Sequence, residues 1–181
     1  MNPSDPEFSH IVKLDEIGAG TSHHNIQASA TERAALALRF DLLSLDLLEA
    51  TLVLSRSGMN ARASGRMSAR AVQACIAGGN DVQAVIDAPV EIDFLPELQT
   101  TSDAEIELTP DDCDTMFHDG KIIDIGEAVA QTLALALDPY PRSDAASQKL
   151  RAAGVKADNE VEAASGPFAA LASLKDTLSK Q

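Results

Sequence analysis

The chain has 181 residues and a formal net charge of −14, with 45% hydrophobic but only 3% aromatic residues. This length suits one main domain with tails, and the hydrophobic content excludes a wholly disordered chain. A sequence pI near 4.5 argues against broad nucleic-acid binding, because the field of the whole molecule repels phosphate, and it favours basic partners such as ribosomal proteins.

No targeting or membrane segment is expected. The sequence begins MNPSDPEF, which has neither a basic region nor an apolar run, and two cysteines are too few for a disulfide framework. The longest mostly apolar run, residues 128–137, is about half of the roughly 20 residues that a spanning helix needs. These features predict a cytoplasmic protein with no membrane partner.

The charge is unevenly distributed along the chain. Residues 51–80 carry +4 and no acidic residue, whereas the total is −14, so the rest of the chain carries −18. The four cations are Arg56, Arg62, Arg66 and Arg70. Residues 97–119 hold eight acidic residues and no lysine or arginine. We predict an acidic loop there, represented by Asp111, Asp112 and Asp114.

The N-terminal part predicts two strands and a helix. Residues 1–7 are expected to be a flexible tail, because they contain two prolines, and residues 8–14 alternate as a strand does. A returning strand is predicted over residues 21–28. Ser29 and Glu32 then have the spacing of a capping box, so a short helix should follow.

The basic segment predicts a β-hairpin. Two long runs, residues 42–56 and 61–76, flank the turn-forming residues 57–60, and the second run alternates small residues with arginines and serines. Arginines four apart would also align on a helix, so the local pattern leaves both structures open; Gly65, the serines and the preceding turn favour a strand. The hairpin register is not fixed, and Arg56 could lie on either face.

The remaining chain predicts one more strand, two helices and a linker. Residues 82–94 alternate as a strand, with Pro89 at a bulge or an edge, and Ile106 and Leu108 suggest another short strand. A helix is predicted from Ile125 to Leu137.

Residues 142–165 are polar and have no clear period, which suggests a linker before a C-terminal amphipathic helix over residues 166–181. Phe168, Leu171 and Leu174 form its apolar stripe, a docking element for its own domain or for a partner.

The predicted fold class is therefore α+β. We expect one domain over residues 8–141, built on a single antiparallel sheet that is either flat or curled. Two short helices would lie over this sheet, and the C-terminal helix would dock separately.

Three separated motifs resemble the YceD family. The first is the stretch Gly120 to Pro141, GKIIDIGEAVAQTLALALDPYP, preceded by an acidic loop. The second is Gly166 to Lys175, GPFAALASLK, and the third is a hairpin that ends in Val72-Gln-Ala-Cys75. The resemblance extends over about residues 8–175 and is specific because the three motifs agree.

The resemblance implies a cytoplasmic factor needed for normal levels of large-subunit ribosomal RNA. Many members of the family carry Cys-x-x-Cys at the end of the hairpin, but Cys75-Ile-Ala-Gly78 keeps only the first cysteine. A metal or redox role that depends on this pair is therefore not expected here. The other histidines and cysteines do not have a usual zinc spacing, so no metal and no cofactor are predicted.

The sequence contains no phosphate-binding glycine loop, no nucleophile motif and no carboxylate pair in an apolar setting, so we expect a protein without enzymatic activity. One hypothesis is that Arg56, Arg62, Arg66 and Arg70 contact large-subunit ribosomal RNA or its precursor, and that DNA is not a partner. Against this, the arginines could simply pair with the acidic loop, and no aromatic residue lies among them to stack on bases. The alternative function is an acidic adaptor that holds a basic ribosomal protein through residues 97–119, with Phe168 as an anchor.

Overall fold

The computed structural model describes residues 6–18, 20–78, 80–97 and 114–155. The chain divides into two units, Met1–Ala74 with Asp81–Pro141, and Cys75–Asn80 with Arg142–Gln181, and each is described by itself. Among the described residues, no helix is long and apolar enough to cross a membrane.

The described residues of the first unit form a five-stranded sheet, a two-stranded sheet and three helices. Its elements are β1 (Ile11–Lys13), α1 (Leu14–Ile17), β2 (Thr21–Gln27), α2 (Ala30–Arg39), β3 (Ser44–Ser57), β4 (Asn60–Gln73), β5 (Val82–Pro96), β6 (Thr115–His118), β7 (Ile122–Asp124) and α3 (Ile125–Ala136). The large sheet has the order β2-β3-β4-β5-β6, and the small one pairs β1 with β7. The second unit contains α4 (Asp144–Ala152).

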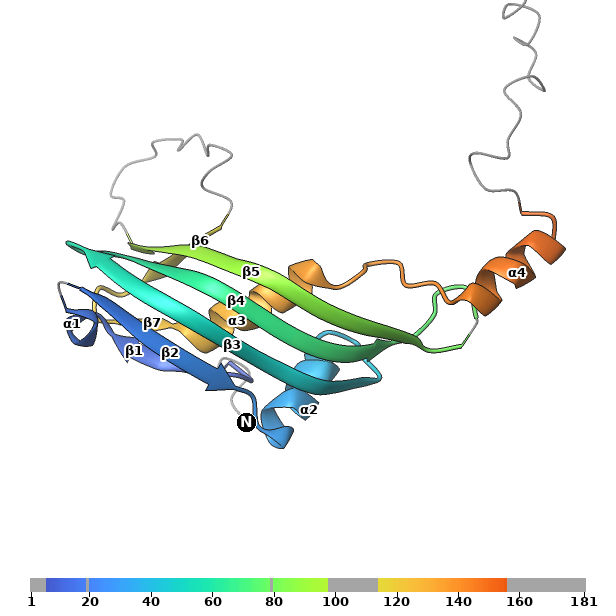
Figure 1. Cartoon of the computed structure of the whole chain (residues 1–181), viewed down its shortest axis with the longest axis horizontal. Helices are drawn as coiled ribbons and strands as arrows, with labels where there is room; N and C mark the ends of the chain where they lie inside the picture. Colours follow the sequence, from blue (N-terminus) through green and yellow to red (C-terminus); the bar gives the residue numbers. More distant parts are fainter. Residues whose placement is uncertain (1–5, 19, 79, 98–113, 156–181) are drawn as a thin grey trace, which may run out of the picture. The chain divides into compact units, whose positions relative to one another are not determined.

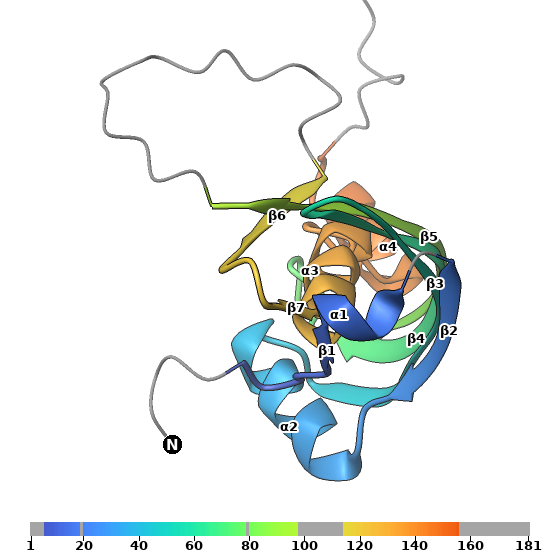
Figure 2. The same ribbon diagram turned by 90° about the vertical axis from the view of Figure 1, so that its left-hand side faces the viewer.

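The five-stranded sheet curves around α3 (Figures 1 and 2). We call the side that faces α3 the inner face and the opposite side the outer face. The inner face carries the core, in which side chains from β3, β4, β5 and α3 are fully buried, among them Leu52, Met67, Val90, Phe94 and Leu133. Within the described part of this unit, no helix covers the outer face.

The long hairpin confirms the strand interpretation of the basic segment. β3 and β4 are joined at Gly58-Met59, with Ser57 opposite Asn60 and a positive φ of 64° at Gly58. Inward residues of β4 are mostly alanines that are almost completely buried: Ala61, Ala63, Ala69 and Ala71. Small side chains here allow α3, which presents Ala128 and Ala130 to the core, to pack close to the sheet. Tertiary burial of this face therefore selects the strand over the helix.

The predicted capping box begins α2. The Ser29 hydroxyl accepts a hydrogen bond from the Glu32 backbone, and the Glu32 carboxylate accepts one from the Ser29 backbone. The strand predicted over residues 82–94 is also confirmed, and it runs without interruption through Pro89. The predicted helix after Asp124 is α3, which buries Val129 and Leu133.

The sheet differs from the predicted antiparallel one in two ways. β6 pairs in parallel with β5, because the chain leaves β5 at its end and re-enters beside it in the same direction. β1 does not pair with β2; it pairs antiparallel with β7, so Val12 lies opposite Ile123. Both pairings join segments that are distant in sequence, which local alternation does not reveal.

Two helices of the described residues were not expected. The short helix α1 follows β1, and α4 occupies part of the segment that was predicted to be a linker. Ser143 caps α4 by accepting a hydrogen bond from the Ala146 backbone at 3.3 Å. The predicted strand at Ile106–Leu108 and the C-terminal helix over residues 166–181 lie outside the described residues.

Candidate nucleic-acid interface

Arg62, Arg66 and Arg70 lie on the outer face of β4, as the alternation predicted. The side chains of Arg62 and Arg66 are 54% and 65% exposed. Because a strand advances about 3.3 Å per residue, arginines four residues apart are separated by about 13 Å. We call these three residues the arginine row.

The carboxylates of the neighbouring strand β5 lie beside the arginine row. Arg62 Nη2 is 3.3 Å from Glu91 Oε2, and its Nη1 is 3.7 Å from Asp93 Oδ2. Arg66 Nε donates a hydrogen bond to Asp87 Oδ1. Among the described residues Arg70 makes no ion pair; its cross-strand neighbours are Leu47 of β3 and Val85 of β5.

The outer face is therefore not a uniformly basic surface. Glu49 of β3 joins Asp87, Glu91 and Asp93 of β5, so four carboxylates oppose three arginines, which leaves this group one net negative charge at neutral pH. Sequence reasoning expected the acidic loop as the competitor of the arginines and missed the acids of β5. The sequence did contain this information, because an antiparallel pairing of residues 61–73 with residues 82–94 places Asp93 opposite Arg62.

Arg56 does not lie with the arginine row. It comes from the inner side of β3, where its guanidinium donates to the Leu14 carbonyl at 2.8 Å and the Gly58 carbonyl at 2.8 Å, and approaches Asp15 at 3.2 Å. These bonds tie the hairpin turn to α1. Arg56 and Arg62 nevertheless both line a hollow of about 490 Å³ near the tip of the hairpin.

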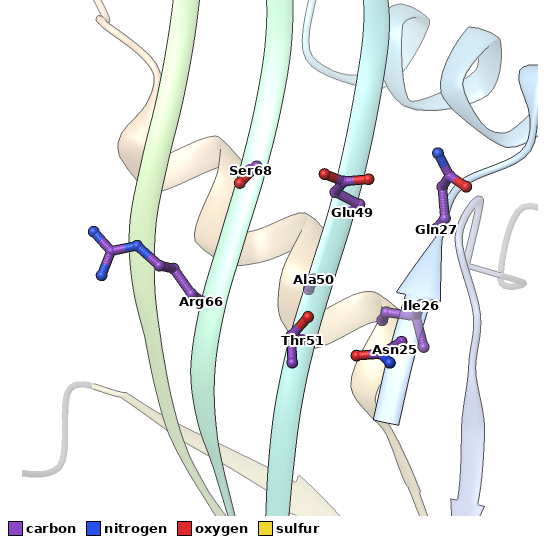
Figure 3. Close-up of a pocket in the computed structure, with 8 residues that line it drawn as sticks. All are labelled: Asn25, Ile26, Gln27, Glu49, Ala50, Thr51, Arg66 and Ser68. Atoms are coloured by element: carbon purple, nitrogen blue, oxygen red, sulfur yellow. The ribbon is translucent and has the colours of Figure 1, made fainter. Parts of the chain in front are cut away.

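A second hollow of about 610 Å³ lies across β2, β3 and β4 (Figure 3). Its outer-face lining is polar and consists of amides, hydroxyls, one carboxylate and one guanidinium: Asn25, Gln27, Glu49, Thr51, Ser68 and Arg66. In Figure 3 the Arg66 side chain extends away from Thr51 toward β5. This hollow offers many hydrogen-bond donors and acceptors but no aromatic ring on which a base could stack.

The other predicted site residues fall mostly outside the described chain. Asp111, Asp112 and the docking residues Phe168, Leu171 and Leu174 belong to that part. Asp114 is described and exposed, and its backbone carbonyl accepts a hydrogen bond from Asp93 N–H at 3.0 Å, which starts the pairing of β6 with β5.

Two histidines meet at the edge of the unit near β2. The rings of His10 and His24 are 6.2 Å apart in an edge-on arrangement, and the Ser22 hydroxyl lies 3.1 Å from His24 Nε2. The pKa of His24 is lowered, first by partial burial and then by the charges of His10 and His23. Among the described residues, no group of three or more histidines, cysteines or carboxylates is arranged to hold a metal ion.

A comparison with protein-family models places this arrangement in context. The model described as "Large ribosomal RNA subunit accumulation protein YceD" matches residues 63–175, which is more than half of the chain. The chain belongs to the YceD family. No curated protein matches it, and no solved structure matches it.

The YceD motif at residues 120–141 has structural tasks in this chain. Asp124 caps α3 by accepting from the backbones of Gly126 and Glu127, and it also accepts from Ser9 Oγ at 2.6 Å and His10 N–H at 2.8 Å. Gly126 permits this contact, because a Cβ there would lie 2.6 Å from the His10 nitrogen. The motif thus fixes the N-terminal segment against α3.

Glu127 of the same motif joins α3 to α2. Its carboxylate accepts two hydrogen bonds from Arg39, at 2.9 and 2.8 Å, and Arg39 also binds Glu7 at 2.9 Å. Burial alone would raise the pKa of Glu127, but hydrogen bonds from Arg39 and Gln131 outweigh it and lower the pKa. The hydrogen bond with Glu127 in turn raises the pKa of Arg39.

The turn that opens the motif is held by polar contacts. The Asp119 carboxylate accepts hydrogen bonds from the backbones of Lys121 and Ile122, which lower its pKa. His118 is buried, receives a hydrogen bond from Gly120 N–H at its Nδ1, and has its Nε2 3.0 Å from the Met59 carbonyl. These bonds connect the turn to the tip of the hairpin.

Cys75, the one cysteine that this chain keeps of the Cys-x-x-Cys pattern, lies in the second unit. Cys75 is half-buried, and its Sγ accepts a hydrogen bond from the Ser143 backbone N–H at 3.4 Å. Lys149 of α4 donates to the Gly78 carbonyl at 3.1 Å in the same unit.

Proposed function

We propose that this protein supports the accumulation of large-subunit ribosomal RNA by contacting RNA through the arginine row. The observation that carries the proposal is the row itself: three outward arginines at regular spacing on a sheet face that no described helix of the unit covers. A spacing of about 13 Å corresponds to roughly two nucleotides of an extended backbone, so successive arginines could reach alternate phosphates. The description of the YceD family supplies the biological context.

The neighbouring carboxylates limit this contact without preventing it. Arg62 and Arg66 are more than half exposed, and exposed ion pairs contribute about 0 to 1 kcal/mol. A phosphate can therefore replace a carboxylate partner at small cost. The same carboxylates repel phosphates elsewhere on the face, so binding is expected only where an RNA presents phosphates along the row.

The test is replacement of Arg62, Arg66 and Arg70 by alanine, followed by RNA-binding measurements over a range of salt concentrations. With Arg56 turned to the inner side, three phosphate contacts predict a slope of log affinity against log salt of about −2 to −2.7, which the variant should lose. A control that removes the same charge outside the row is the triple alanine variant of Lys13, Lys121 and Arg142. Equal affinity and slope for the wild type and the row variant would refute RNA contact through this row.

The second candidate function is an adaptor that holds a basic ribosomal protein. The four carboxylates on the outer face favour it, because they outnumber the arginines there. Purification of the protein from cells with and without nuclease separates the two functions. Partners held by RNA should be lost on nuclease treatment, whereas a directly bound basic protein should stay.

A further inference from the structure

Strand β5 has a long edge that no strand of the described residues pairs with. β6 pairs only with Asp93–Pro96, whereas β4 pairs with β5 from Val82 to Phe94. Within the described part of the chain, the stretch from Val82 to Ile92 therefore has a strand on one side only. An open edge of this kind presents backbone donors and acceptors that an extended segment can use.

The direction of the backbone groups on this edge follows from two observations. The Asp93 N–H donates to the Asp114 carbonyl, so it points away from β4. N–H groups alternate along a strand, and the register of β4 and β5 is regular, so the N–H groups of Asp87 and Glu91 point the same way. Pro89 is another of the residues whose backbone nitrogen points away from β4. Its missing N–H therefore removes no hydrogen bond between β4 and β5.

A groove lies along the same edge. It has a volume of about 120 Å³ and is lined by Pro89 and Ile92 of β5, Thr115 and Met116 of β6, and Thr132 and Leu135 of α3. The Leu135 side chain is 82% exposed, although it lies on a helix whose other face is buried in the core. A segment that extended the line of β6 along β5 would place its inward side chains on Leu135 and Met116.

The carboxylates beside this edge favour a binding segment with basic side chains. Outward side chains of an added strand would lie next to Asp87 and Glu91, whose carboxylates are 59% and 65% exposed. Cross-strand pairs of opposite charge stabilise a sheet, and like charges destabilise it. A second copy that paired its own β5 antiparallel about Pro89 would bring Asp87 opposite Glu91, so it is disfavoured. The chain's own residues 98–113, which hold five acids and no lysine or arginine, are disfavoured for the same reason.

We propose that the β5 edge from Asp87 to Ile92 binds an extended segment of a basic protein in which lysine or arginine alternates with apolar residues. The segment adds a strand to the sheet, its basic side chains pair with Asp87 and Glu91, and its apolar side chains cover Leu135. Asp87 and Glu91 also pair with Arg66 and Arg62, so the basic side chains of the segment compete with the arginine row for these carboxylates. The proposal does not depend on contact of the arginine row with RNA.

The experiment measures binding of a labelled synthetic peptide, about ten residues long, in which lysine alternates with valine. Fluorescence anisotropy with the full chain gives its Kd, and hydrogen exchange with and without the peptide follows the amides of Asp87 and Glu91. We expect binding together with slower exchange at both amides. Two comparison peptides are an alternating glutamate–valine peptide and a non-alternating peptide with the same lysines and valines, and both should bind at least about tenfold more weakly.

Three variants separate the contributions of backbone, charge and apolar contact. Glu91→Pro removes an edge N–H without removing a bond to β4, and Glu91→Gln removes only the charge of that side chain. Leu135→Ser removes the apolar contact, and Leu38→Ser, at a leucine of α2 that is 86% exposed, is its control. We expect the Kd to rise about tenfold or more for Glu91→Pro and Leu135→Ser, less for Glu91→Gln, and less than about twofold for Leu38→Ser.

Several results would overturn the proposal. Absence of peptide binding, equal binding of the glutamate peptide, or equal Kd values for Leu135→Ser and Leu38→Ser would each do so. A dimer in sedimentation experiments that Glu91→Pro dissociates would show that a second copy occupies the edge instead. Thermal melts of all variants establish that each one is folded, and RNA binding of Glu91→Pro, measured separately, tests the arginine row independently.

Discussion

At the scale of single residues, close backbone contacts explain two glycines that no cap or turn requires. Gly65 lies in the middle of β4, and a Cβ there would be 2.0 Å from the Thr51 carbonyl oxygen. Gly126 similarly allows the backbone of His10 to approach α3. In both places the obstacle is backbone, which cannot move aside as a side chain can.

Replacement of Gly65 by alanine should therefore destabilise the protein by at least about 1 to 3 kcal/mol, because β3 must shift to accept the methyl group. Gly20 is the matched control, since a Cβ there meets no atom within 4 Å. Chemical unfolding of both variants measures the difference. Equal stability of Gly65→Ala and Gly20→Ala would contradict the close approach of β4 to β3.

The hydrogen bonds between Arg39 and Glu127 predict how stability depends on pH. The folded pKa of Glu127 lies below its ordinary value of 4.5, so the stabilisation is fully present above about pH 4.5 and is lost as the pH falls through the lowered folded pKa. Glu127→Gln should lower the free energy of unfolding by about 1 to 3 kcal/mol at neutral pH and by less in acid. Unfolding curves at several pH values test this expectation, and a pH-independent loss would contradict it.

At the scale of elements, β4 and β5 form two adjacent stripes of opposite charge on the outer face. The two stripes lie side by side because the register of β4 and β5 is regular: no bulge shifts it between the pair Ala61 and Phe94 and the pair Gln73 and Val82. Each stripe limits what the other can bind. The arginine row competes with any basic ligand of β5, and the carboxylates of β5 compete with RNA phosphates.

Removal of the acidic stripe should therefore strengthen RNA binding if the arginine row contacts RNA. In the variant with Asp87→Asn, Glu91→Gln and Asp93→Asn, each released ion pair contributes up to about 1 kcal/mol, so affinity should rise up to about fivefold for each pair that phosphate replaces. Electrophoretic titration with large-subunit ribosomal RNA fragments measures the change. Weaker RNA binding by this variant would argue against the row, and loss of a basic protein partner would favour the adaptor function.

At the scale of the whole molecule, the net charge of −14 is the dominant electrostatic property. Repulsion among the acids opposes the compact state and directs anionic ligands away, except where arginines concentrate. A protein of this charge that acts on RNA must therefore do so through a small surface, or must act through a basic partner.

Self-repulsion predicts that salt stabilises the fold. Raising the ionic strength from about 20 mM to about 200 mM shortens the range of the repulsion from roughly 20 Å to less than 10 Å, so the Tm should rise. Calorimetry at constant pH measures the change, and RNA affinity should fall over the same range. A Tm that falls with added salt would show that local ion pairs such as Arg39 with Glu127 outweigh the net charge.

Much of the fold could be predicted from local patterns. The alternation in residues 61–76, with Gly65, the serines and the preceding turn, favoured a strand with arginines on one side, although arginines four apart also fit a helix. The Ser29 and Glu32 spacing predicted the cap of α2, and the Asp124 signal predicted α3, because each depends on neighbours within a few residues. The family could likewise be recognised from motifs in the chain.

Tertiary structure alone decided the rest, because those features depend on which distant segments meet. It placed Arg56 on the inner side beside Leu14, paired β1 with β7, set β6 parallel to β5, and brought Asp87, Glu91 and Asp93 beside the arginine row. A strand pattern specifies two faces but neither the neighbouring strand nor the register. Here the neighbouring strand β5 places carboxylates beside the arginines, so the outer face carries both charges.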